Sequence, residues 1–121
     1  MLELIDIGIE KAVAYRWGGK ITEDDMTLAL SAIKEKIENY GDVCIYQEIE
    51  SFGGIKFDAI VEEFKFLFDV GLSNISRMAV VTNKKWMHKI VDLEDKLFKK
   101  IDMKSFSIED KNKAIEFLKS A

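Results

Sequence analysis

Two short apolar segments, each followed by a segment with helical periodicity, constrain the fold of this chain most strongly. Residues 43–49 and 77–82 have the length and composition of strands that are buried on both faces. Such strands belong to parallel sheets that carry helices on both sides. The pattern therefore predicts an α/β sandwich.

The start of the chain predicts an antiparallel hairpin and then a long helix. Residues 2–7 and 11–19 are short β-rich segments, and the second alternates large and small side chains. Thr22 and Asp25 have the spacing of a capping box, apolar residues follow at helical intervals, and Gly41 ends the pattern. This helix is the clearest element in the sequence.

The rest of the chain alternates helices and strands. The remaining elements that we predict are helices over residues 56–71 and 84–100, a strand at 104–106 and a helix over 108–119. Ser107 and Asp110 repeat the capping pattern before the last helix. The result is a mixed, mostly parallel sheet of about five strands with about four helices, in which only the opening hairpin is antiparallel.

Composition limits the class of protein. The chain has 121 residues, of which 48% are hydrophobic, and no linker-like segment divides it, so we expect a single domain over residues 1–121. A formal net charge of −4 gives no basic field for nucleic acid. One cysteine, Cys44, no secretory pattern after Met1 and no apolar segment of about 20 residues predict a cytoplasmic protein, at most peripheral to the inner face of a membrane.

The helix predicted over residues 56–71 has apolar side chains on two faces. One face, an arc of about 120°, is suited to packing on the sheet. Phe66 and Val70 lie on the opposite face together with Ala59, beside acidic residues. A second apolar stripe predicts a second contact, which could be a partner, a membrane, a ligand or the next helix of the chain.

The helix predicted over residues 84–100 is the second informative element. Its apolar face spans about 160°, and the opposite side is rich in lysine. The residues that we predict to contact a ligand or membrane are Phe66, Val70, Trp86, Met87, Val91 and Phe98, with Lys89 and Lys96 near anionic head groups. The same pattern also arises when a helix packs on a sheet and on a neighbouring helix together.

Three segments carry a family resemblance that covers essentially the whole chain. They are Trp17-Gly18-Gly19-Lys20-Ile21-Thr22, Glu48-Ile49-Glu50 before Phe52-Gly53-Gly54, and Ala79-Val80-Val81 before Lys84-Lys85-Trp86. They resemble the SpoIIAA-like group within the wider STAS fold, which is similar in shape to lipid-carrying CRAL-TRIO domains. The resemblance implies a non-enzymatic domain that binds something apolar or lies at a membrane.

The turn after residues 43–49 departs from the pattern of the anti-sigma-factor antagonists in that fold. Those proteins carry a phosphorylatable serine in an Asp-Ser-Ser-Gly-like turn, whereas here Ser51 is followed by Phe52, Gly53 and Gly54. We therefore do not assign a phosphorylation site to Ser51. The turn, with Ser51, Gly53 and Gly54, is instead where a polar ligand would bind, because ligands in α/β sheets bind beyond the carboxyl ends of strands.

The sequence supports neither catalysis nor a bound metal or cofactor. The single histidine, His88, has no second histidine or cysteine at ligand spacing. No nucleophile, base and orienting acid are brought together by the pattern. The main hypotheses are a domain that contacts a lipophilic small molecule or an anionic membrane, and a STAS-like regulatory module that binds a protein partner or forms a homodimer. A third, weaker hypothesis, an enzyme that acts at the glycine turn, would require a catalytic constellation that the sequence does not show.

Overall fold

A computed structural model describes residues 1–19, 22–50, 74–83 and 102–120 of the protein. In chain order the elements are β1 (Leu2–Ile5), β2 (Ala12–Trp17), α1 (Glu23–Tyr40), β3 (Val43–Ile49), β4 (Ile75–Thr82), β5 (Asp102–Phe106), a short 3-10 turn (Ile108–Asp110) and α4 (Lys111–Lys119). The helices predicted over residues 56–71 and 84–100 lie outside the described residues.

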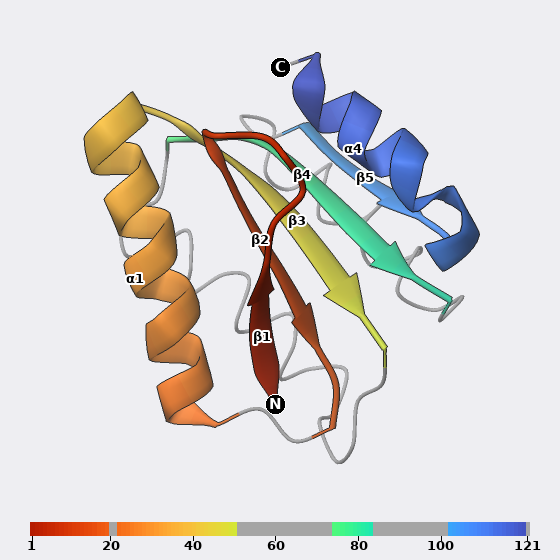
Figure 1. Ribbon diagram of the computed structural model, residues 1–121, viewed down its shortest axis with the longest axis horizontal. Coiled ribbons are helices and arrows are strands. Elements are labelled where there is room, and N and C mark those ends of the chain that lie inside the picture. Colours follow the sequence, from red (N-terminus) through yellow and green to blue (C-terminus); the bar gives the residue numbers. More distant parts are fainter. Residues whose placement is uncertain (20–21, 51–73, 84–101, 121) are drawn as a thin grey trace.

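The five strands form one sheet in the order of the chain, β1-β2-β3-β4-β5. β1 is antiparallel to β2, and every other neighbouring pair is parallel. α1 lies on one side of the sheet and α4 on the other (Figure 1). The predicted α/β sandwich with a mostly parallel sheet and an opening hairpin is confirmed.

β3 is the central strand, and all seven of its residues are buried. Successive side chains of a strand point to opposite faces of the sheet. Ile45 and Ile49 accordingly belong to the apolar core beneath α1, whereas Cys44 and Tyr46 belong to the core beneath α4. This strand therefore separates two cores that lie on opposite faces of one sheet.

The core beneath α1 contains the larger aliphatic and aromatic side chains. Ala29 and Ile33 on the helix pack against strand residues that include Val13 and Ile45. Ile33 is completely buried, a change of environment that typically stabilises a fold by about 1.5–3 kcal/mol per side chain. This apolar stripe determines the face of α1 that lies on the sheet.

The core beneath α4 is formed by smaller side chains. Ala114 and Leu118 of the helix are buried against a cluster that includes Cys44 and Tyr46. The Cys44 Sγ lies 3.4 Å from the Ser76 Oγ and 3.9 Å from the Leu118 backbone oxygen. Cys44 is thus a buried residue directly under the last helix.

The ends of α1 agree with the sequence. The backbone N–H of Asp25 donates to the Thr22 Oγ1 over 3.2 Å, and the Thr22 N–H donates to the Asp25 Oδ2 over 3.0 Å, so the predicted capping box is present. At the other end Gly41 has φ +82°, a conformation that glycine adopts readily, and its N–H donates to the Ile37 oxygen. The predicted helix limits are confirmed.

Several predicted element boundaries are wrong, and β4 and β5 each begin two residues earlier than predicted, at Ile75 and Asp102. β1 ends at Ile5 rather than at residue 7, because Asp6 accepts a hydrogen bond from the Gly8 N–H and the chain turns there with Gly8 at φ +80°. The last helix begins at Lys111, after a 3-10 turn, and the Ser107 hydroxyl donates to the Asp110 side chain instead of capping a backbone N–H.

Candidate functional site

All the predicted site residues lie outside the described residues. They are Phe66, Val70, Trp86, Met87, Lys89, Val91, Lys96 and Phe98 on the predicted helices, and Ser51, Gly53 and Gly54 in the predicted turn. The structure does place the strand ends before these segments: Ile49, the last residue of β3, lies opposite Thr82, the last residue of β4. The candidate sites that the structure describes are therefore formed by residues other than the predicted ones.

β1 is an edge strand with backbone groups that face outward. The Met1 amino group donates to the Gly18 oxygen over 2.7 Å, and the Gly18 N–H donates to the Met1 oxygen over 3.1 Å. Hydrogen-bonded and non-hydrogen-bonded pairs alternate along an antiparallel ladder. By this alternation Glu3 directs its N–H and C=O to β2, whereas Leu2 and Leu4 direct theirs to the open edge.

The outward groups of Leu2 and Leu4 differ in their partners. The Asp25 carboxylate accepts a hydrogen bond from the Thr22 N–H over 3.0 Å, which lowers the pKa of Asp25, and the nearby Leu2 backbone lowers it further. The N–H and C=O of Leu4 have no hydrogen-bond partner within the described part of the chain. The side chains of Leu4 and Leu28 are each 44% exposed. We call the Leu4 backbone with these two side chains the edge surface.

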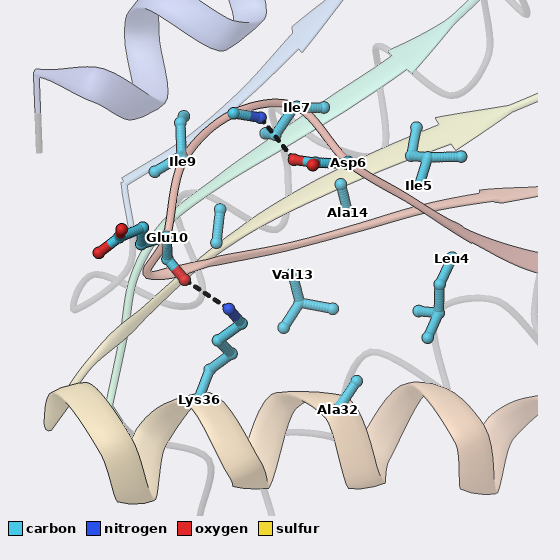
Figure 2. Close-up of a pocket in the computed structure, with 12 residues that line it drawn as sticks. Leu4, Ile5, Asp6, Ile7, Ile9, Glu10, Val13, Ala14, Ala32 and Lys36 are labelled. Carbon is cyan, nitrogen blue, oxygen red and sulfur yellow. Dashed lines mark hydrogen bonds between the residues drawn. The ribbon is translucent and has the colours of Figure 1, made fainter.

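A pocket of about 450 Å³ lies beside the edge surface, between α1 and the β1–β2 connection. Leu4, Val13, Ala32 and Lys36 lie in the space between the hairpin and α1, and the Lys36 Nζ donates to the Glu10 oxygen over 2.6 Å (Figure 2). The other lining residues are Ile5, Asp6, Ile7, Gly8, Ile9, Glu10, Ala12 and Ala14. The lining is mostly apolar, and the volume of the pocket falls within the range of about 300–1,000 Å³ that is typical of small-molecule sites.

Arg16 and Glu48 form a charged pair on neighbouring strands at the carboxyl end of the sheet. The Arg16 Nε donates to the Glu48 Oε2, and the Tyr46 hydroxyl donates to the Glu48 Oε1 over 3.1 Å. The pKa of Arg16 is raised, first by its hydrogen bond to Glu48 and then by the charge of that carboxylate. The guanidinium also lies 3.4 Å from the Glu50 carboxylate. Since two carboxylates already neutralise Arg16, this cluster is a poor receptor for a further anion.

The opposite face of the sheet carries a buried neutral pair. The Tyr15 hydroxyl donates to the Gln47 Oε1 over 2.6 Å, and burial raises the pKa of Tyr15. The Gln47 Nε2 is buried without a hydrogen-bond partner among the described residues. These groups position the strands and do not open to solvent.

The sequence interpretation missed both polar pairs and the edge surface. Gln47 and Glu48 stand within a segment that was interpreted as apolar, and their presence there was the available signal of buried polar pairing. The alternation in residues 11–19 did place Arg16 away from Tyr15 and Trp17. The position of β1 at the sheet edge follows from strand order, for which the sequence carries no local signal.

The described part of the chain shows neither a metal-binding cluster nor a membrane-spanning helix. The described residues contain no group of three or more His, Cys, Asp or Glu side chains that could hold a metal ion. Among the same residues, no helix combines the length and apolar character that a membrane span requires.

A five-stranded mixed sheet with helices on both faces defines an α/β domain of the SpoIIAA/STAS type. The chain belongs to the SpoIIAA-like family, whose model matches residues 12–119. A crystal structure of an uncharacterized protein with a SpoIIAA-like fold from Shewanella loihica is similar, with a TM-score of 0.68 at 18% sequence identity over 98% of this chain and 92% of that one. No curated protein shows significant sequence similarity. The family resemblance predicted from the sequence is confirmed.

Proposed function

We propose that this chain is a non-enzymatic interaction module and that its edge surface binds an extended segment of a partner protein. Membership of the SpoIIAA-like family is consistent with an interaction or regulatory role. The proposal rests on the N–H and C=O of Leu4, which have no partner within the described part of the chain, together with the half-exposed side chains of Leu4 and Leu28. Backbone groups and apolar area together are what strand addition requires.

The bound segment would continue the sheet beyond β1. Its backbone would exchange hydrogen bonds with Leu4, while its side chains would point alternately to the two faces of the sheet. On the α1 side these side chains would meet Leu4 and, along the helix, Ala32 and Leu28, which are one helical turn apart. The apolar contacts favour apolar residues at alternate positions of the segment.

The opposite edge of the sheet is less suited to strand addition. β5 carries Asp102 and Lys104 with exposed side chains. Charged residues on edge strands, lysine above all, discourage pairing with another chain. This comparison favours β1 as the edge that accepts a partner.

The test separates the backbone of Leu4 from its side chain. Peptides selected from a random library on the wild-type protein are titrated against Leu4→Pro and Leu4→Ala. Proline removes the outward N–H, which an edge strand tolerates, whereas alanine keeps that N–H and removes only the side chain. We expect binding to Leu4→Ala to weaken moderately and binding to Leu4→Pro to be lost; equal binding to both variants would contradict strand addition.

The pocket supports a second candidate function, binding of a lipophilic small molecule. Its walls are mostly aliphatic, and one ammonium group, that of Lys36, stands at its rim. Decanoate can serve as a probe, with NMR shifts of the Ala14 and Ala32 backbone amides as the measurement. Ala32→Phe should fill the pocket and remove the shifts, while Ala114→Gly, in the core beneath α4, should leave them unchanged.

The predicted contact with an anionic membrane is tested separately, because it rests on the sequence pattern of residues 84–100. Co-sedimentation with vesicles that contain anionic lipid, at physiological and at high salt, is the measurement. If the lysines contact head groups, the double variant Lys89→Glu, Lys96→Glu should bind more weakly, and wild-type binding should decrease with salt. Unchanged binding by the charge-reversed variant would count against the contact.

A further inference from the structure

We infer that the segment taken up by the edge surface is β1 of a second copy, paired antiparallel so that Leu4 lies opposite Leu4 of that copy. This inference rests on the proposed function and names its partner. A two-fold axis through the Leu4 pair makes the interface self-complementary, as the symmetric contact of a homodimer must be. The donors and charges of β1 favour this register over the one shifted toward the N-terminus.

The outward backbone groups of β1 match in this register. The N–H and C=O of Leu4 exchange two hydrogen bonds with the same groups of the second copy. Asp6 lies opposite Leu2, and the free C=O of Leu2 can accept from the Asp6 N–H of the other copy. The Leu2 N–H is not required, which is important because it lies at the Asp25 carboxylate.

The register shifted toward the N-terminus is less favourable on both counts. It would place Leu2 opposite Leu4 and would use the Leu2 N–H, which lies at the Asp25 carboxylate. It would also place Glu3 directly opposite Glu3 of the second copy, and like charges at directly opposed positions are destabilising. In the register with Leu4 at the centre, Glu3 faces Ile5 instead.

The side chains and helices are compatible with this pairing. The Leu4 side chain lies on the same face of the sheet as α1 and Leu2. In the dimer, the half-exposed Leu4 side chains of the two copies would therefore meet on one face of a continuous ten-stranded sheet. α1 packs chiefly on β2 and β3 rather than on β1. Pairing at the outer side of β1 therefore does not require displacement of α1.

Cysteine cross-linking tests the register. Leu4→Cys and Glu3→Cys are each placed in a Cys44→Ala background and oxidised, and the products are separated without reductant. Directly opposed residues of a hydrogen-bonded pair have Cα atoms about 5.5 Å apart, within disulfide range, whereas diagonal neighbours at about 7 Å or more fall outside it. We expect Leu4→Cys to double in mass and Glu3→Cys to remain monomeric.

Sedimentation of the unmodified wild-type chain over a range of concentrations completes the test. A concentration-dependent increase in mass that Leu4→Pro abolishes and Leu4→Ala retains in part would support the inference. Preferential cross-linking of Glu3→Cys, or a monomer at every concentration together with no Leu4 cross-link, would overturn it. In the second case, peptides that bind Leu4→Ala and not Leu4→Pro would show that the proposed function survives with a different partner.

Discussion

The Tyr15 hydroxyl donates a 2.6 Å hydrogen bond to the side-chain oxygen of Gln47, which lies directly opposite on the neighbouring parallel strand. Both residues are buried, and burial raises the pKa of Tyr15, so the phenol remains a donor across the ordinary pH range. This neutral pair lies within an otherwise apolar core.

Removal of the Tyr15 hydroxyl should therefore destabilise the fold. Tyr15→Phe leaves the buried Gln47 amide with no hydrogen-bond partner among the described residues for either polar end, at a cost of about 1–3 kcal/mol. Urea unfolding measures this cost. The double variant Tyr15→Phe, Gln47→Met should recover much of the loss, because it removes both polar partners; a double variant no more stable than the single one would contradict the explanation.

On the opposite face, substitutions of the two acidic residues that contact Arg16 should have different effects on the free energy of unfolding. Glu48 is 6% exposed and accepts from both Arg16 and Tyr46, so Glu48→Leu should cost about 1.5–3 kcal/mol of unfolding free energy. Glu50, 58% exposed and 3.4 Å from the same guanidinium, is the control. Glu50→Gln should change stability by less than about 1 kcal/mol, and equal losses for the two variants would argue against a buried role for Glu48.

The capping carboxylate predicts a dependence of stability on pH. Hydrogen bonds from the Thr22 backbone, followed by smaller contributions that include Leu2, lower the pKa of Asp25 from its ordinary value of 3.8. A carboxylate whose pKa is lower in the folded state contributes stability above its unfolded pKa and loses it as the pH falls through the folded value. The stability difference between wild type and Asp25→Asn should thus shrink below about pH 4. A difference that is constant between pH 7 and pH 2.5 would contradict this assignment.

Arg77 should control how firmly α4 is held on the sheet. Its Nη1 donates to the Phe117 oxygen over 2.6 Å and to the Ser120 Oγ, and its guanidinium lies 4.8 Å from the centre of the Phe117 ring. Arg77→Leu should increase amide exchange in the last turn of α4, consistent with a loss of about 1.5–3 kcal/mol for a charged hydrogen bond. Lys104→Leu, which removes only a second cation from the same ring, should have a smaller effect.

The sequence predicted the elements whose signals are local. The Thr22–Asp25 capping box, the end of α1 at Gly41 and the buried strand Val43–Ile49 each follow from a few adjacent residues, and the structure confirms them. The family resemblance added the global fold, which the match over residues 12–119 supports.

The features that the sequence did not predict depend on strand register and order. The pairing of Arg16 with Glu48 requires β2 and β3 to be parallel neighbours in one particular alignment, which alternation within a strand leaves undetermined. The same holds for the outward backbone of Leu4, which follows only once β1 is known to lie at the edge. The predicted contacts through Phe66 and Trp86 remain predictions.

The chain has one cysteine, and its thiol lies fully buried beneath α4. Because two cores lie on opposite faces of the sheet, α4 can in principle detach while α1 remains packed. The rate at which an alkylating reagent modifies Cys44 in native buffer would then report the opening of the C-terminal helix by itself. The Cys44 sulfur is thus an intrinsic chemical probe of how long α4 remains packed on the sheet.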